Sequence, residues 1–294
     1  MPKSILVTGA NGQLGNELRE LSVLYPDFTF TFIGRSELDL SNSAAIQAWF
    51  HDKLFDVIIN CAAYTAVDKA ESEQALAKAI NTTAVDTLAR IAKEKAIALI
   101  HISTDYVFDG KNFKPYSETD PTDPQAIYGQ TKLDGELAML AINPANSIII
   151  RTSWVYSSFG NNFVKTMLRL GKEREELGVI YDQVGTPTSA RDLAQAILSI
   201  IQHPKLSAQK ETAIYHFSNE GVCSWYDFAL AIFELSDIHC TVKPIETLDY
   251  PTPAKRPHYS LLNKAKIKNT FEITIPYWKD SLQACLDVLK GNKL

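Results

Sequence analysis

The sequence predicts an α/β protein: a doubly wound parallel sheet with a smaller α/β domain toward the C-terminus. Short β-branched and aliphatic runs alternate with helical patterns through the first half of the chain, as in parallel sheets covered by helices on both faces. A turn with three glycines, Gly9, Gly12 and Gly15, follows the first run and precedes a helical pattern. The length of 294 residues is enough for such a sheet and a second, smaller core.

Each run in the first half has the length of a strand or of a helix. Short segments rich in Ile, Val, Thr and Phe predict strands at residues 4–8, 29–33, 57–60, 98–103 and 147–151. Longer segments between them have helical periodicity and predict helices at residues 12–24, 43–52, 71–94 and 128–142. Strands that alternate with helices in this way are expected to be parallel and joined by right-handed crossovers.

The pattern becomes less regular after about residue 155. We expect helices at residues 162–170, 190–202 and 279–289, and strands at residues 179–181 and 213–218. Four prolines exclude one long helix from the stretch before the final helix: Pro244, Pro251, Pro253 and Pro257. We therefore interpret residues 1–155, together with about 190–220, as one domain, and about 156–189 with 221–294 as the second.

Composition and charge argue against several classes of protein. The formal net charge of −5 gives no general attraction to nucleic acid or to an anionic membrane surface. No apolar run approaches the roughly 20 residues that span a bilayer. The first residues show no leader pattern, so we expect a cytoplasmic protein. The four cysteines and six histidines show neither zinc-site nor disulfide spacing, and no metal site is expected.

The glycine turn has the sequence context of a dinucleotide-binding site. Glycine permits a tight turn and lets backbone N–H groups approach a pyrophosphate at the start of the following helix. The order of strand, turn and helix predicts a Rossmann-type domain in which these residues bind the cofactor: Gly9, Asn11, Gly12, Gln13, Leu14 and Gly15. An ordinary glycine-rich turn is the alternative interpretation.

The end of the second expected strand bears on the choice of cofactor. A carboxylate usually stands there when the cofactor is NAD, because it binds the 2′-hydroxyl of the ribose. Here the position holds Arg35, followed by Ser36. A guanidinium group can pair with a 2′-phosphate, which predicts a preference for NADPH and leaves NADH open as a second cofactor. A solvated surface arginine is the alternative interpretation.

Tyr128 and Lys132 are the expected catalytic pair. They stand four residues apart at the start of an expected helix, which places the phenol and the ammonium group on one face. The nearby cation is expected to favour the phenolate and so to lower the pKa of Tyr128. Ser103 and Thr104 stand at the end of an expected strand, where a hydroxyl can help to polarise a carbonyl group. A cap at the end of the strand is the alternative for both hydroxyls.

Several longer strings resemble the dTDP-4-dehydrorhamnose reductase family, which belongs to the extended short-chain dehydrogenases. They extend over almost the whole chain, at residues 60–71, 103–110, 151–156, 160–163, 185–188 and 254–257. The resemblance implies an enzyme that uses NADPH to reduce the C4 ketone of a dTDP-linked sugar, for rhamnose of a cell-surface polysaccharide. It selects Thr104 as the hydroxyl that acts with Tyr128 and Lys132. The resemblance leaves open whether the protein forms a homodimer.

The same resemblance implies further contacts in the site. The first domain would bind NADP(H), with contacts from Asp39, Leu40, Ala62, Ala63 and Tyr64. Tyr128 and Lys132 would contact the cofactor as well, Lys132 at the nicotinamide ribose. The second domain would help to bind the nucleotide sugar, whose sugar part is expected against Thr65, Asp105, Tyr106 and Trp154. Asn162 and Arg256 would lie nearer the diphosphate. From the residues alone, Trp154 fits a core aromatic equally well, and Arg256 a solvated charge.

Tyr106 marks a departure from the similar sugar-nucleotide dehydratases. In those enzymes the Ser-Thr pair is often followed by Asp and Glu, which act as acid and base. Here Asp105 is followed by Tyr106, so elimination of water lacks its expected proton shuttle, whereas reduction of a ketone does not need one. Two alternatives stay open: a reductase or epimerase of another nucleotide sugar, and a non-catalytic NADP-binding regulatory subunit.

Overall fold

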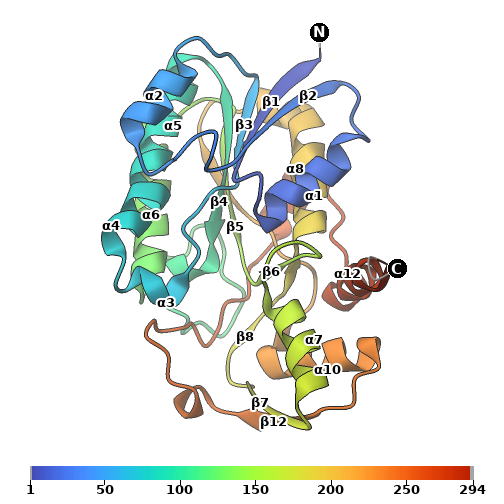
Figure 1. Ribbon diagram of the computed structural model, residues 1–294. Coiled ribbons are helices and arrows are strands. Elements are labelled where there is room, and N and C mark those ends of the chain that lie inside the picture. The colour runs from blue at the N-terminus through green and yellow to red at the C-terminus, as the bar shows by residue number, and fades with distance from the viewer. Residues whose placement is uncertain (1, 292–294) are drawn as a thin grey trace.

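The computed structural model describes residues 2–291, and a parallel sheet lies between two sets of helices (Figure 1). The strand order is β10-β5-β4-β3-β1-β2, and every neighbouring pair is parallel. The strands are β1 Lys3–Thr8, β2 Phe28–Ile33, β3 Val57–Asn60, β4 Ala98–Thr104, β5 Ile148–Thr152 and β10 Ala213–His216. All six overlap segments that the sequence predicts as strands, and the predicted fold class is confirmed.

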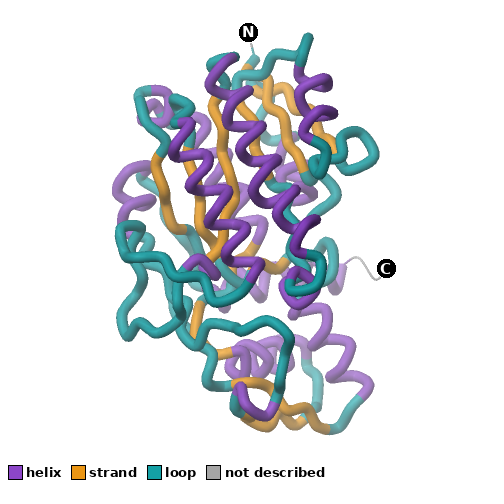
Figure 2. The backbone as a smooth tube through the Cα atoms, turned by 90° about the vertical axis from the view of Figure 1, so that its left-hand side faces the viewer, coloured by secondary structure: helices purple, strands orange, loops and turns teal. Residues whose placement is uncertain are grey.

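Different helices cover the two faces of the sheet, because alternate side chains of a strand point to opposite sides. In β1, Ile5 and Val7 belong to one core, whereas Leu6 belongs to the other. The first core is covered by α1 Gln13–Ser22, α8 Ala190–Gln202 and α11 Ala265–Phe271. The second is covered by α2 Ser43–Phe50, α5 Ala84–Glu94 and α6 Ile127–Ile142, whose side faces the viewer in Figure 2.

A second, smaller set of elements packs around a core of its own, below the sheet in Figure 1. Tyr156, Phe228 and Trp278 are buried within it. Its longer elements are α7 Phe163–Glu173, β7 Glu176–Ile180, α10 Trp225–Ser236, β12 Thr241–Ile245 and α12 Trp278–Gly291. Its short strands form the pairs β6 Val155–Tyr156 with β9 Thr188–Ser189, and β8 Val184–Gly185 with β11 Cys223–Ser224.

Two of the longer elements of this part, α10 and β12, are not among those expected from the sequence, and neither are its four short strands. Helix α10 begins with a capping box in which Ser224 and Asp227 satisfy each other's backbone N–H groups. Strand β12 contains Pro244 and pairs only with β7 in a two-stranded sheet, an edge position where a missing N–H is tolerated. The prolines therefore exclude a helix from this stretch but not a strand. Two further short elements are α9 Pro204–Ser207 and the 3-10 turn η3 Thr247–Asp249.

The single helix expected over residues 71–94 is wrong in its first half. The structure has α3 Val67–Ala70, α4 Gln74–Lys78 and the π-helical turn η1 Ala79–Thr83 before α5. Asn81 lies in the π-helical turn, where its side-chain oxygen accepts from the Tyr64 N–H at 2.8 Å and its amide group donates to the Tyr64 carbonyl at 3.1 Å. The extra residue in this turn directs Asn81 inward, so that it holds the loop after β3.

Two further findings concern the described part of the chain. Within residues 2–291, no helix is long and apolar enough to cross a membrane. The same residues contain no group of three or more His, Cys, Asp or Glu side chains that could hold a metal ion. Cys223 is buried, and the other three cysteines are partly buried.

Candidate active site

A cavity of about 1010 Å³ opens where the strands of the sheet end. Thr8, Thr104 and Thr152 are the last residues of β1, β4 and β5, and all three line the cavity. The carboxyl ends of parallel strands meet at this edge, which is where ligands of open α/β sheets bind. Trp154 and Asn162 line the cavity from the second half of the chain, so both halves contribute to it.

Most of the site residues predicted from the sequence line this one cavity. The two exceptions are Gly15 and Arg256. The predicted residues that the structure brings together there are Gly9, Asn11, Gly12, Gln13, Leu14, Arg35, Asp39, Leu40, Ala62, Ala63, Tyr64, Thr65, Thr104, Asp105, Tyr106, Tyr128, Lys132, Trp154 and Asn162.

The glycine turn brings backbone close to backbone. Gly9 has a φ of +65°, and a Cβ atom there would lie 2.7 Å from the backbone nitrogen of Ala62. Gly12 is the N-cap of α1 and lines the cavity. Because glycine has no side chain to cap the helix, the first backbone N–H groups of α1 have no side-chain acceptor at this end. Gly15 allows α1 to pack closely on the turn, because a Cβ atom there would lie 2.5 Å from the Gly9 carbonyl oxygen.

Gly9→Ala is expected to destabilise the fold, because a left-handed backbone and a backbone contact both oppose a side chain at this position. We expect the free energy of unfolding to fall by about 1–3 kcal/mol or more. Urea unfolding followed by circular dichroism measures it. Gly12→Ala is the matched control, because its Cβ atom would meet one atom at 3.2 Å and its φ is ordinary. Equal losses in the two variants would contradict this account of Gly9.

Arg35 lines the cavity, and its side chain is 75% exposed. Its guanidinium group pairs with Asp39 at 3.5 Å. The Asp39 carboxylate also accepts from the N–H and the hydroxyl of Ser41, at 2.9 and 2.7 Å, and these bonds hold its pKa below the ordinary value. Glu37 accepts from the Gly34 N–H at 2.7 Å, so a carboxylate does stand near the end of β2. Glu37 was not expected at the site, because it comes beyond the last residues of the strand.

Tyr128 and Thr104 line the cavity as neighbours. Burial raises the pKa of Tyr128 to about 12, while the Thr104 hydroxyl lowers it and the charge of Asp105 raises it. The sequence led us to expect that Lys132 would lower this pKa, and that expectation is wrong. Burial outweighs any attraction by the ammonium group, whose nitrogen is held elsewhere. Tyr128 is therefore a protonated phenol at neutral pH.

Lys132 is almost fully buried, with 1% of its surface exposed. Its side-chain nitrogen donates to the Ile102 carbonyl at 2.6 Å and lies 3.3 Å from the Nε2 atom of His101. Burial lowers the pKa of Lys132 to about 8, although the charge of Glu136 raises it. Tyr128 and Lys132 thus lie on one face of α6, as expected, but burial is the main cause of the shifted pKa of each side chain.

Asp105 and Tyr106 form a short 3-10 turn directly after β4, η2 Asp105–Val107. Thr104 donates its hydroxyl proton to Asp105 at 2.9 Å. Burial raises the pKa of Asp105 to about 6, against the lowering effect of Thr104 and Ser260. The Tyr106 ring packs edge-on against Tyr128, with centroids 5.4 Å apart. The buried carboxyl group of Asp105 and the phenol of Tyr106 therefore lie beside Tyr128.

Trp154 is both a packing residue and a lining residue. It stacks on Trp225 with ring centroids 3.6 Å apart, and it also lines the cavity. Its φ of +50° is uncommon for a bulky residue and is typical of functional positions. A Cβ atom at Gly185 would lie 3.0 Å from the Trp154 ring, so this glycine makes room for the indole.

Asn162 and Arg256, the two residues expected near a diphosphate, have different surroundings. Asn162 caps α7 and donates to the Gln13 side chain at 2.9 Å, so it reaches the glycine turn. Arg256 lies outside the cavity lining and makes two hydrogen bonds to Asp68, at 2.9 and 2.7 Å. The guanidinium group is thus held at α3 by a carboxylate.

Other lining residues carry no signal in the local sequence pattern. Glu73 accepts a hydrogen bond from the Tyr64 hydroxyl at 2.7 Å, and it lines the cavity with Lys69 and Ile80. Glu73 and Ile80 fall within residues 71–94, where one regular helix was expected, and Lys69 precedes that range in α3. The irregular helix start brings their side chains to the cavity.

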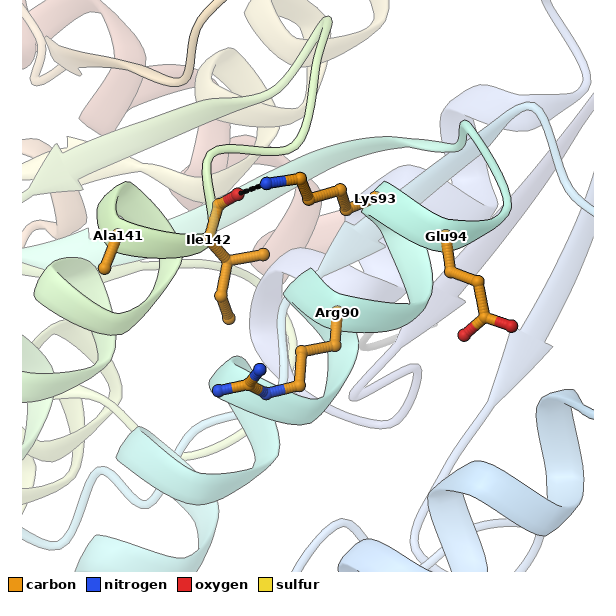
Figure 3. Close-up of a pocket in the computed structure, with 5 residues that line it drawn as sticks. All are labelled: Arg90, Lys93, Glu94, Ala141 and Ile142. Carbon is orange, nitrogen blue, oxygen red and sulfur yellow. Dashed lines mark hydrogen bonds between the residues drawn. The ribbon is translucent and has the colours of Figure 1, made fainter.

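A second hollow lies at the ends of α5 and α6, away from this site (Figure 3). It is lined by Arg90, Lys93, Glu94, Ala141 and Ile142. Lys93 crosses it and donates to the Ile142 carbonyl at 2.6 Å. None of the predicted site residues lines this hollow, and the large cavity is the better candidate.

The parallel sheet, the glycine turn and the Thr104, Tyr128 and Lys132 group at one cavity define a Rossmann-type protein of the short-chain dehydrogenase/reductase class. Residues 3–290 match the family described as RmlD substrate binding domain, and the chain belongs to this family. The chain is 43% identical over 282 residues to the dTDP-4-dehydrorhamnose reductase of Sinorhizobium fredii (strain NBRC 101917 / NGR234), with 94% of each chain covered. The resemblance noted in the sequence is confirmed.

Two solved structures are similar over almost the whole chain. The dTDP-4-dehydrorhamnose reductase of Clostridium acetobutylicum ATCC 824 has a TM-score of 0.92 and 43% identity, and 98% of this chain and 99% of that chain are covered. The dTDP-4-dehydrorhamnose reductase of Bacillus anthracis str. Ames was solved in complex with NADP. It has a TM-score of 0.89 and 38% identity, with 98% of this chain and 100% of that chain covered.

Proposed function

We propose that this chain is an NADPH-dependent reductase that converts dTDP-4-dehydro-L-rhamnose to dTDP-L-rhamnose, the last step of dTDP-rhamnose biosynthesis. The observation that carries the proposal is the common cavity of the glycine turn with Thr104, Tyr128 and Lys132. Relatives named dTDP-4-dehydrorhamnose reductase support the substrate, since they match over nearly the full length. A cytoplasmic location, expected from the sequence, is part of this proposal.

The residues present fit a dinucleotide cofactor. The cavity of about 1010 Å³ is at the upper end of the roughly 300–1,000 Å³ of most small-ligand pockets. Gly9 and Gly12 leave backbone N–H groups open at the start of α1, which suits a pyrophosphate. Arg35 would bind the 2′-phosphate, Ala62 and Ala63 would let the backbone approach, and the reduced nicotinamide supplies the hydride when bound.

The mechanism follows from the protonation states of the chain's own groups. Tyr128, with a pKa of about 12, holds its proton at neutral pH and gives it to the carbonyl oxygen of the substrate as negative charge develops there. Thr104 would turn its single hydroxyl proton from Asp105 to that oxygen as a second hydrogen bond, and this stabilises the developing charge. Lys132 orients the nicotinamide ribose, and its ammonium group favours the phenolate that remains after proton transfer.

The second part of the chain completes the substrate site in this proposal. Residues 1–155 with about 190–220 would form the NADP(H)-binding domain, and about 156–189 with 221–294 the sugar-nucleotide-binding domain. Thr65, Asp105, Tyr106 and Trp154 would contact the sugar, since they surround Tyr128 or line the cavity beside it. Asn162 and Arg256 would contact the diphosphate, and Arg256 would exchange Asp68 for phosphate oxygens.

The groups around Tyr128 favour reduction over dehydration. Asp105 is the carboxyl group that acts on Tyr128, and Tyr106 occupies the next position. Burial holds the pKa of Tyr106 above its ordinary value, so it cannot replace the carboxylate base of a dehydratase at neutral pH. Reduction needs one proton donor and one hydride, and the site supplies the donor.

The test is the loss of NADPH absorbance when the purified protein is mixed with dTDP-4-dehydro-L-rhamnose. Rapid oxidation with the L sugar, and slow or absent oxidation with a 4-keto sugar of the D series, is the expected result. Equal rates with both sugars would contradict the proposed preference for the L sugar and indicate a wider range of substrates. Binding of NADPH without turnover of either sugar would favour a regulatory subunit instead.

Arg35→Asp is expected to weaken NADPH relative to NADH. The substitution removes the partner of the 2′-phosphate and puts a second negative charge beside Asp39. We expect the ratio of the two dissociation constants to change by about tenfold or more, equivalent to about 1.4 kcal/mol. Fluorescence titration with each cofactor measures it, and Arg174→Asp is the control at an exposed position outside the cavity. An unchanged ratio would remove Arg35 from the cofactor site.

A further inference from the structure

Three polar side chains lie side by side in the middle of the sheet. Thr8 in β1 pairs with Asn60 in β3, and Asn60 pairs with His101 in β4, so the three form one row across neighbouring strands. The row continues on both sides with isoleucine, Ile33 beyond Thr8 and Ile149 beyond His101. Each of the three polar residues is at most 1% exposed. Polar groups at such positions cost free energy unless they are hydrogen-bonded.

The row is connected by hydrogen bonds and ends at Lys132. The Thr8 hydroxyl donates to the Asn60 side-chain oxygen at 2.7 Å, and the Asn60 side-chain nitrogen lies 3.1 Å from the Nδ1 atom of His101. The other ring nitrogen of His101, Nε2, lies 3.3 Å from the Lys132 nitrogen. An ammonium group has three donors, and the contacts with His101 and the Ile102 carbonyl use two of them. One donor is then left for the cavity.

The direction of these hydrogen bonds depends on the proton of Lys132. Burial and the charge of Lys132 hold the pKa of His101 well below its ordinary value, so its ring is neutral and has one donor and one acceptor. An ammonium group at Lys132 needs Nε2 as acceptor, so Nδ1 carries the proton, and the Asn60 amide must turn over to present its oxygen to Nδ1 and its NH₂ group to Thr8. A neutral amine at Lys132 can accept from Nε2. Nδ1 then accepts from the Asn60 NH₂ group and the Asn60 oxygen accepts from Thr8, which is the arrangement that the structure shows. Asn60 serves both cases because its amide has a donor and an acceptor.

We infer that Thr8, Asn60 and His101 are positioning residues for Lys132, which hold its side-chain nitrogen at the cavity and adapt to either of its protonation states. This inference rests on the role of Lys132 in the proposed function. The row keeps a hydrogen-bond partner for the lysine in both states, so that its ammonium group can lie at the cavity floor despite complete burial. Two titratable groups act on Lys132: Glu136 on α6, which is paired with Arg151 on β5, and His101 on β4, which lies against its nitrogen. Tyr128 stands one turn earlier on α6.

Two substitutions in the row are expected to shift the titration of Lys132 in opposite directions. His101→Leu removes an acceptor from the ammonium group and favours the neutral amine. Asn60→Asp places a carboxylate that can only accept, which fixes Nε2 as acceptor and favours the ammonium group. NADPH binding and turnover are expected to fall on the alkaline side as Lys132 loses its proton, and we call this fall the alkaline limb. We expect the limb to move down by about one pH unit in His101→Leu and up by about one unit in Asn60→Asp.

Two further variants separate positioning from stability. His101→Gln keeps an amide oxygen for Lys132 and is expected to restore the wild-type limb. His216→Leu removes another fully buried histidine, one outside the cavity lining, and is expected to leave the limb unchanged even if it lowers stability. Dissociation constants for NADPH, measured by fluorescence between about pH 6 and about pH 10, cover both sides of the limb.

A direct readout needs neither sugar nor cofactor. Nitrogen-15 NMR of labelled histidine distinguishes the two ring tautomers, and His101→Gln assigns the His101 signals. Below the limb we expect His101 to carry its proton on Nδ1, and above the limb on Nε2. One fixed tautomer across the limb would overturn the inference, as would limbs that shift in the same direction in His101→Leu and Asn60→Asp. Failure of the wild-type protein to reduce the sugar would instead overturn the proposed function and leave the NMR result as the test of the row.

Discussion

Tyr128→Phe is expected to lower kcat for the reduction of dTDP-4-dehydro-L-rhamnose by about 10²–10⁴-fold, the usual contribution of a general acid. The substitution removes one hydroxyl from a ring that is held by Tyr106 and the cavity wall, and it leaves the ring in place. The affinity for NADPH should change little, because Lys132, Arg35 and the glycine turn are untouched. Stopped-flow absorbance of NADPH measures the rate, and fluorescence titration measures the affinity.

The pH dependence of the wild-type rate gives a second view of the same step. Tyr128 stays protonated through neutral pH because its pKa is about 12, whereas Lys132 loses its proton as the pH rises through about 8. Activity should therefore fall on the alkaline side near the pKa of Lys132. Tyr106→Phe is the matched control, since it removes the other phenol of the ring pair and should reduce kcat much less. Comparable losses in both variants would leave the proton donor unassigned between the two phenols.

Glu136→Gln is expected to lower the free energy of unfolding by about 3–5 kcal/mol, because it leaves a buried guanidinium group without its counter-ion. The side chains of Glu136 and Arg151 are 0% and 3% exposed. Arg151 donates to the carboxylate from Nε at 3.0 Å and from Nη2 at 2.6 Å, and it also lies over the ring of Phe108. Urea unfolding monitored by fluorescence and circular dichroism measures the change.

The double variant Glu136→Gln with Arg151→Met is the control for this prediction. It removes both charges, so a large part of the lost stability should return, whereas two independent losses would add. A Glu136→Gln protein as stable as the wild type would contradict the assigned pairing. The same substitution should also lower the pKa of Lys132 further, because the charge of Glu136 raises it.

Much of the cavity could be predicted from the sequence, because several of its residues lie close together in the chain and local backbone geometry sets their relative positions. Tyr128 and Lys132 share a face of α6 since they are one helical turn apart, and the glycine turn follows the first strand directly. The surroundings that decide their chemistry come from distant segments. The pKa of Tyr128 is raised by burial, a quantity that no local spacing contains, so the expectation of a lowered pKa failed.

By itself the sequence determined the succession along the chain of the strands that form the sheet, the turn at Gly9 and the position of the tyrosine and lysine on one helix. Backbone geometry and side-chain periodicity act over a few residues, which is why these features can be inferred locally. Only the tertiary structure decided the partners of Arg256, Trp154 and Lys132. Their contacts with Asp68, Trp225 and His101 join residues 188, 71 and 31 positions apart, and only the packed fold brings such residues together.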